Sequence, residues 1–255
     1  MAHKTLIGGT AYEIKGGKTL VGGTAYSIKG GKTIVGGTVH EVGFGIPIGE
    51  LAVGSSVFLN VNGELREFLV VHQGLPSSAY DSSCNGTWLL QKDIYENRKW
   101  HNSVSSVYSA SDIHSYLNST FIDQFDSNIK SAIKTVKIPY TNGSSGASGS
   151  VASGSSGLSA KAFLLSMIEV GFASSQSVPT RNEGAVLSYF SSADAGMRVA
   201  YCMGVANQWY LRSPSTDSTT NYVYWINSKG VYQKGNATKL YGVRPAIILP
   251  SDFEI

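Results

Sequence analysis

The sequence has few charges, few cysteines and no long apolar run, and each shortage excludes a class of protein. Only 15% of its 255 residues are charged, and 20 basic residues against 17 acidic ones give a formal net charge of +3. With this near balance and no basic stripe, nucleic acid is not expected as a partner. Two cysteines, Cys84 and Cys202, are too few for a disulfide framework. We expect free, buried thiols, although their spacing alone leaves a pairing open.

Membrane and secretion signals are also missing from the sequence. No apolar run reaches the ~18 residues that a membrane-spanning helix needs, so no membrane insertion is expected. The N-terminus, from Met1 to Gly9, lacks the basic-then-apolar order of a secretory signal peptide. We therefore expect a chain that is made in a cytoplasm and stays there or leaves by another route.

Catalytic and metal-binding motifs are missing too. The sequence contains no Gly-x-Ser-x-Gly, His-Glu-x-x-His, P-loop or Rossmann glycine pattern. Its histidines and aspartates are scattered and form no calcium-type Asp-x-Asp loop. The sequence thus predicts no enzyme, no cofactor and no metal site.

Glycine, by contrast, is abundant, and part of it forms a repeat. The segment that begins at Lys4 returns at Lys18 and again at Lys32, a period of 14 residues in which Gly-Gly pairs separate short β-compatible runs. Residues 1–45 are therefore expected to form a small β-meander that serves in attachment or oligomerisation. Because such a sheet has one apolar face to cover, it favours a homo-oligomer, with a trimeric β-prism preferred. A flexible Gly-rich linker is the alternative.

Residues 46–255 are expected to form one ligand-binding domain of the α+β class. Asn62-Gly63 between apolar runs predicts a β-hairpin. Ser111 can cap a first helix, and an apolar stripe from Phe125 to Ile133 predicts a second. Residues 141–159 are almost wholly Ser, Gly and Ala, so we expect a solvated insertion there. The last third is strand-like again.

The C-terminal segment is rich in tyrosine, since six of the 14 tyrosines lie between residues 201 and 241. Alternation along the strand around Tyr224 predicts that Val223 and Trp225 face the core while Tyr222 and Tyr224 face outward. Tyrosine with small polar residues on a rigid β scaffold is typical of a binding surface, and an ordinary polar sheet face is the equal alternative. The predicted ligand-binding residues are Asn207, Tyr210, Asp217, Thr219, Asn221, Tyr222, Tyr224, Asn227 and Tyr232.

Three ordered motifs carry a resemblance to known proteins: Trp209-x-Leu-Arg-Ser-Pro, Val223…Ile-Asn-Ser-x-Gly230, and Tyr241-Gly-Val-Arg-Pro-Ala-Ile-x-Leu249. Over residues 54–249 the chain resembles proteins of gut-type bacteria and their prophages. It is similar there to C-type-lectin-fold proteins of the formylglycine-generating-enzyme type and to the variable proteins of diversity-generating retroelements. The Gly-Gly-Thr repeat separately resembles N-terminal segments of prophage minor structural proteins.

The resemblance implies a C-type-lectin-like domain whose C-terminal polar and tyrosine positions are diversified. Scaffold roles are implied for Trp209, Leu211, Gly242 and Pro245, and for the two arginines Arg212 and Arg244. We expect carbonyls or a carboxylate to hold these arginines, with an anion-binding pair as the alternative.

The expected function is therefore recognition of a host-surface protein or glycan by a phage or prophage tail-tip or fibre protein, located in the virion. One alternative is a formylglycine-generating-type oxidase, which would need Cys84 and Cys202 close together. The other is a bacterial cell-surface adhesin.

Overall fold

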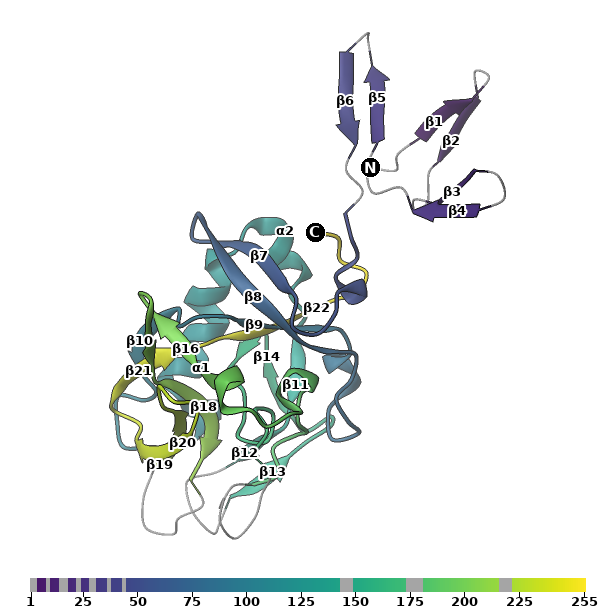
Figure 1. The fold of residues 1–255 in the computed structure, drawn as a ribbon. Coiled ribbons are helices and arrows are strands. Elements are labelled where there is room, and N and C mark those ends of the chain that lie inside the picture. The colour runs from purple at the N-terminus through teal and green to yellow at the C-terminus, as the bar shows by residue number, and fades with distance from the viewer. Residues whose placement is uncertain are drawn as a thin grey trace.

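The structure is a computed structural model that describes residues 45–142, 149–172, 181–215 and 222–255, together with the backbone of six strands within residues 4–42. Most of the described chain after residue 45 surrounds one apolar core with two five-stranded sheets (Figure 1). The first sheet has the order β15 (Ala162–Phe163), β22 (Ala246–Leu249), β9 (Thr87–Gln91), β8 (Glu64–Gln73) and β7 (Ser56–Val61). The second has the order β10 (Glu96–Lys99), β21 (Leu240–Val243), β18 (Trp209–Pro214), β19 (Tyr222–Ile226) and β20 (Tyr232–Asn236).

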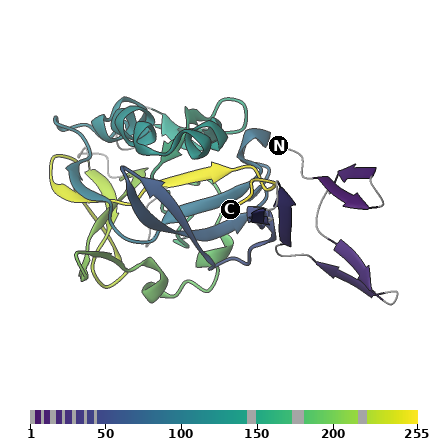
Figure 2. The same ribbon diagram turned by 90° about the horizontal axis from the view of Figure 1, so that it is seen from above.

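The first sheet forms the centre of the molecule. All residues of β9 and β22 are buried, as expected of strands covered on both faces. The helical segments line one face of this sheet (Figure 2). Phe125, which lies between two of them in the sequence, packs on Phe68 of β8 with ring centroids 6.1 Å apart. The hairpin between β7 and β8 turns at Asn62-Gly63, both with positive φ, so this prediction is confirmed.

Three further two-stranded sheets complete the described β structure of this part. Their strands are β11 (Val136–Ile138) with β14 (Leu158–Ala160), β12 (Tyr140–Asn142) with β13 (Ser150–Ala152), and β16 (Ala200–Cys202) with β17 (Val205–Asn207). The predicted solvated insertion over residues 141–159 is therefore wrong at both flanks. Thr141 is buried, β13 pairs with β12, and β14 pairs with β11 before the insertion. Gly149 and Gly157 lie so close to the facing strands that a Cβ on either would collide with them. Residues 143–148 lie outside the described part.

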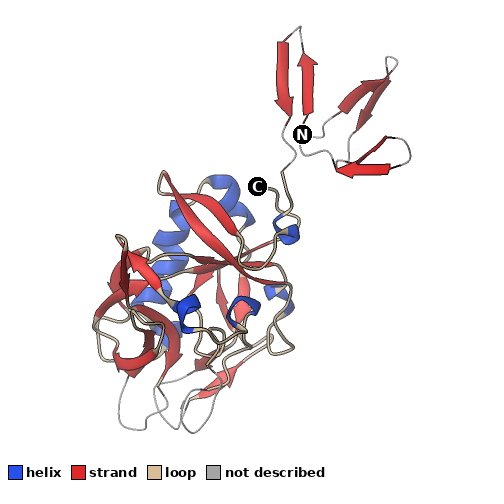
Figure 3. Cartoon of the chain, in the orientation of Figure 1, coloured by secondary structure: helices blue, strands red, loops and turns tan. Residues whose placement is uncertain are grey.

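The predicted α+β class with two helices is also wrong, since strands dominate the fold (Figure 3). Ser111 does cap a helix, because its hydroxyl accepts a hydrogen bond from the His114 amide. However, α1 (Asp112–Tyr116) has only five residues and continues as a π turn, η4 (Leu117–Phe121), and a 3₁₀ turn, η5 (Ile122–Gln124). The second helix, α2 (Ser127–Ala132), has six residues. Single 3₁₀ turns make up the other described helical pieces: η1 (Ile48–Glu50), η2 (Ser82–Cys84), η3 (Tyr108–Ala110), η7 (Ser188–Phe190) and η8 (Ala195–Arg198).

The apolar stripes predicted for the helices are buried even though regular α-helix is short. Ile113, Leu117 and Phe121 are fully buried, and Phe125 and Ile129 nearly so. The sequence pattern thus marked the covered face correctly and overestimated the length of regular helix, because a π turn and a 3₁₀ turn can present the same stripe. Among the described residues, no helix is long and apolar enough to cross a lipid bilayer.

Each N-terminal repeat forms one antiparallel hairpin, with β1 (Lys4–Ile7) on β2 (Thr10–Glu13), β3 (Lys18–Val21) on β4 (Thr24–Ser27), and β5 (Gly31–Val35) on β6 (Thr38–Val42). In each copy a Gly-Gly pair separates the two strands in the sequence, and these glycines lie outside the described residues. The three hairpins are separate two-stranded sheets, so the expected continuous meander is wrong.

Candidate functional site

The structure describes six of the nine predicted ligand-binding residues, while Asp217, Thr219 and Asn221 lie outside the described residues. Tyr210 and Tyr224 are completely buried, so the prediction that Tyr224 faces outward is wrong. Tyr224 lies on the inner side of β19 with Ile226, and its ring is 5.9 Å from that of Tyr232. The two sides of β19 are therefore exchanged relative to the prediction: Tyr224 faces inward, and Trp225, predicted to face the core, is half-buried on the outer side.

The remaining predicted residues have local structural contacts. Tyr232 is half-buried, with its ring 5.1 Å from that of Phe172. Asn227 shapes the turn after β19, because its side-chain oxygen accepts hydrogen bonds from the Lys229 and Val231 amides at 2.9 and 3.0 Å. Asn207 and Tyr222 are half-exposed. The six described residues of the predicted set therefore do not form one exposed face.

A different set of side chains forms a continuous row on the outer side of the second sheet. Tyr210 is directly opposite Trp225 on the neighbouring strand, and Arg98 is directly opposite Tyr241. The Tyr241 ring links the two pairs, with centroids 4.7 Å from Trp225 and 5.2 Å from Tyr210. Tyr116 extends the row, because the Arg98 guanidinium carbon lies 3.6 Å from the centre of its ring. We call Tyr116, Arg98, Tyr241, Tyr210 and Trp225 the aromatic stripe.

The stripe has a buried base and an accessible upper edge. Tyr210 is held at the base, because its hydroxyl donates to the Lys239 carbonyl at 2.8 Å. Trp225 and Tyr241 are half-buried and so remain partly accessible, and 40% of the Arg98 side chain is accessible. Glu96 adds a carboxylate at this end, 2.8 Å from Arg98 Nε. The sequence assigned Trp225 to the core, and Arg98 and Tyr241 were not among the predicted site residues; strand pairing brings the three together, because Arg98 is opposite Tyr241 and Trp225 is opposite Tyr210.

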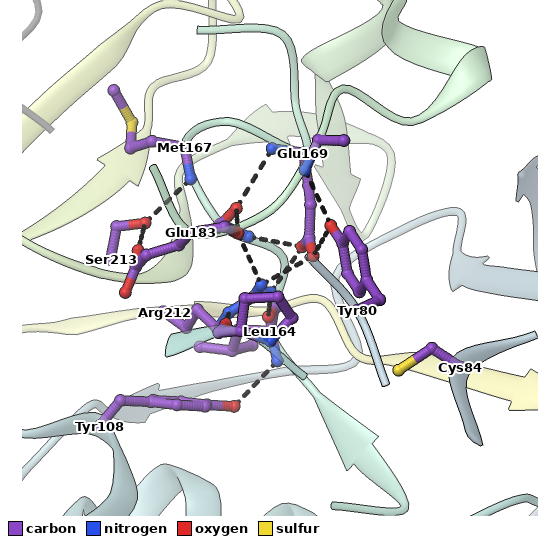
Figure 4. Close-up of polar contacts among 12 residues, drawn as sticks. Tyr80, Cys84, Tyr108, Leu164, Met167, Glu169, Glu183, Arg212 and Ser213 are labelled. Atoms are coloured by element: carbon purple, nitrogen blue, oxygen red, sulfur yellow. Dashed lines mark hydrogen bonds and ion pairs between the residues drawn. The ribbon is translucent and has the colours of Figure 1, made fainter. Parts of the chain in front are cut away.

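The most elaborate polar cluster is buried and belongs to the scaffold (Figure 4). All five N–H groups of Arg212 donate: to the Pro139, Leu164 and Glu183 carbonyls at 3.0, 2.9 and 3.1 Å, and to the Glu169 carboxylate at 2.5 and 2.7 Å. Burial lowers the pKa of Arg212, but the Glu169 carboxylate outweighs it and raises that pKa overall. Arg212 thus joins four segments that are distant in sequence, and the expectation that carbonyls and a carboxylate hold it is confirmed.

The acids of this cluster are satisfied as well. Tyr80 donates to Glu169 Oε1 at 2.8 Å, and burial together with the Glu169 charge raises the pKa of Tyr80 well above its usual value. The Glu183 carboxylate accepts from the Thr141 amide at 2.6 Å and from the Ser213 hydroxyl. With its donors and acceptors matched and no solvent access, the cluster is a structural lock rather than a reaction centre.

The two cysteines have different environments and are both free. Cys84 is buried and donates to the Lys137 carbonyl at 3.3 Å, and burial followed by the Glu169 charge raises its pKa to about 12. A thiol with such a pKa stays protonated and is a poor nucleophile. Cys202 is half-exposed on the β16–β17 hairpin. The structure therefore offers no support for the reactive pair that an oxidase would need.

Two histidines lie near serines but lack the geometry of a catalytic triad. Ser188 Oγ is 2.8 Å from His72 Nδ1, and the Nε2 of the same ring is buried with no partner among the described residues. At His101, the Ser103 amide and the Asp112 carboxylate both approach Nδ1, at 3.0 and 3.4 Å. A triad needs the base and its acid on opposite ring nitrogens, so neither histidine is arranged as one.

The ordered motifs of the C-terminal part lie in the sheets just described, and they coincide with a family match. A family model described as a domain of unknown function (DUF6273) matches residues 85–251. The chain belongs to this family. Comparison with curated proteins found no match, and comparison with solved structures found none either. The DUF6273 match contains Arg212 with its two acids, Glu169 and Glu183, and the aromatic stripe, whereas Tyr80 of the buried cluster and β7 and β8 of the first sheet precede it.

Proposed function

We propose that this DUF6273 protein binds a ligand without chemical conversion, and that the aromatic stripe is the contact surface. The observation that carries the proposal is the half-exposed Trp225–Tyr241 pair next to Arg98 on a sheet anchored from within. Trp, Tyr and Arg are the residue types that supply most of the binding energy in protein interfaces. Their rings present flat apolar area at a low cost in conformational entropy.

The stripe combines two kinds of contact. The Trp225 and Tyr241 rings suit the apolar face of a sugar ring or an aliphatic side chain. At the other end, Arg98 and Glu96 supply a donor and an acceptor for polar groups of the same ligand. A host-surface glycan or protein has both features, and the half-exposed Tyr222 and Asn207 are further contact candidates.

The N-terminal hairpins support a role in attachment. An isolated two-stranded hairpin is marginal in water, so association with other chains is the expected means of stabilisation. We propose a homo-oligomer, with a trimer preferred, in a phage or prophage tail tip or fibre. Several stripes on one particle would raise weak individual contacts to a useful avidity. The same binding logic applies to a bacterial surface adhesin.

Binding of the full-length protein to susceptible bacterial cells, compared with a glycan array, tests the proposal. Trp225→Ala or Arg98→Ala should weaken binding at least thirtyfold, which corresponds to about 2 kcal/mol for a central contact. Trp225→Phe should retain part of the affinity. Phe58→Ala is the matched control, because Phe58 is an aromatic side chain that is 59% exposed on β7.

Melting temperatures of the variants separate loss of binding from loss of fold. The proposal fails if Trp225→Ala and Arg98→Ala keep wild-type affinity, or if Phe58→Ala weakens binding equally. Gel filtration and light scattering of the full chain report the oligomer. A monomer at all concentrations would remove the role proposed for the repeats.

A further inference from the structure

Three arginines are buried in the described part of the chain, and they differ in how their N–H groups are satisfied. Arg212 uses all five, as described above. Arg198 is bonded through each of its three nitrogens, to the Gly230, Val170 and Ala193 carbonyls at 2.8, 3.2 and 3.0 Å. Arg244 donates from Nε to the Gln91 carbonyl at 2.9 Å, but its Nη1 is buried without a partner among the described residues.

Arg244 also lacks a compensating charge. It is 1% exposed, and no carboxylate of the described residues lies within ion-pair distance of it. Its guanidinium carbon is 4.9 Å from the centre of the Trp209 ring, and this cation–π contact offsets only part of the cost of burying the charge. The Tyr189 hydroxyl and the Asp93 carboxylate act to raise the pKa of Arg244, and Asp93 accepts a hydrogen bond from the Tyr201 amide. Burial therefore dominates and lowers the pKa of Arg244 to about 10.

A buried charge with an unused donor is unfavourable unless something pairs with it. We propose that Arg244 anchors a binding site for a small oxyanion, the carboxylate or phosphate group of a ligand or the free ion. One anionic oxygen would accept the Nη1–H hydrogen bond. The site lies where β9 ends at Gln91 and where Arg244 leads into β22, against the Trp209 ring of β18.

The surroundings favour a small anion with a single charge. Asp93 is negative and exposed, so it repels a second charge on the incoming group. Lys92 is the exposed cation next to it in sequence, and it is already paired with Glu67 at 2.9 Å. This site is independent of the aromatic stripe, because Trp209 and the stripe residue Tyr210 are consecutive on β18 and face opposite sides of the sheet.

Thermal melts at neutral pH and constant ionic strength test the inference, with chloride replaced by acetate in one series and by phosphate in another. An anion at ten times its Kd raises the folding equilibrium constant about elevenfold, which moves the melting temperature by a few degrees. Acetate should act at the lower concentration. Arg244→Met should abolish the response. Arg198→Met and Lys92→Met, which remove another buried cation and a nearby exposed one, should keep it.

Calorimetric titration of the wild-type protein with acetate and phosphate does not depend on any variant folding. We expect one site per chain, weakened at least tenfold in Arg244→Lys, which retains a cation without the planar fork. A response confined to phosphate would assign the site to phosphate groups rather than carboxylates. No saturable binding by the wild type, or an unchanged response in Arg244→Met, would overturn the inference.

Discussion

Replacing Glu169 with alanine tests whether the buried cluster holds the fold together. The Glu169 carboxylate accepts four hydrogen bonds: two from Arg212 at 2.5 and 2.7 Å, one from the Tyr80 hydroxyl at 2.8 Å and one from the Ser166 amide at 2.8 Å. Truncation leaves these four donors without an acceptor and the Arg212 charge without its partner, all in a region closed to solvent.

The expected loss follows from these contacts. Removing one partner of a buried ion pair costs about 3–5 kcal/mol of unfolding free energy. Domains have about 5–15 kcal/mol in total, so Glu169→Ala should lose a third or more of the stability. For a chain of this size the melting temperature should fall by about 10 °C. Lys130→Met is the control, because it breaks the exposed 2.6 Å pair with Asp123 and should cost less than about 1 kcal/mol.

Urea denaturation of Glu169→Ala, Arg212→Met and the double variant measures the effect as a double-mutant cycle. The double variant should lose less than the sum of the single losses, because the second change removes the charge that the first left unpaired. It should still be less stable than the wild type, since the Pro139 and Leu164 carbonyls lose their donors. A Glu169→Ala loss no larger than that of Lys130→Met, or strictly additive losses, would refute the reasoning.

Two further predictions concern a turn and a buried imidazole. Gly230→Ala should lower the unfolding free energy measured in urea by about 3 kcal/mol or more, because its φ is +74° and a Cβ there would collide with the Ala195 carbonyl. Gly63→Ala is the control: its φ is +76°, but a Cβ there would have nothing within 4 Å, so it should cost only about 1–2 kcal/mol. Equal losses would contradict the steric part of the argument. Burial lowers the pKa of His114, so its share of stability is present above about pH 6.5 and is lost as the pH falls through the folded-state pKa. His114→Gln should therefore flatten the decline in melting temperature below about pH 6.5, and an unchanged slope would show that His114 does not contribute to it.

Local signals predicted local structure well in this chain. Asn62-Gly63 specified a two-residue hairpin, and Ser111 specified a helix start, because a turn or a cap is determined by a few neighbouring residues. In the N-terminal repeats, the β-compatible runs on either side of each Gly-Gly pair form paired strands. Whether separate hairpins join into one sheet depends on contacts between repeats, and the 14-residue period does not predict those contacts.

The phase of β19 could not be read from alternation, because apolar residues occupy both of its sides. Val223 and Tyr224 are consecutive and both fully buried, so the sheet is covered on each face over part of its length. Alternation of apolar and polar residues then no longer distinguishes the inner side of the strand from the outer side, and a one-residue error in its assignment exchanges the two sets of side chains. The acids of the buried cluster could not be identified from the sequence, since Glu169 and Glu183 lie 43 and 29 residues before Arg212. The one available signal was a charged residue inside the apolar run around Leu211.

Two groups of residues on β18 have different roles in the domain. Arg212 and Ser213 bond to the buried cluster and fix the strand to three other segments, at Pro139, at Leu164–Glu169 and at Glu183, while Tyr210 anchors the base of the aromatic stripe. Because the buried Arg212 cluster holds β18, the partly exposed side chains Trp225 and Tyr241 can be replaced without removing any hydrogen bond of that cluster. Substitutions at Trp225 and Tyr241 should therefore alter binding more than stability, whereas changes at Arg212 should do the reverse. This separation follows from the fold, because the hydrogen bonds of the buried cluster involve no side chain of the aromatic stripe.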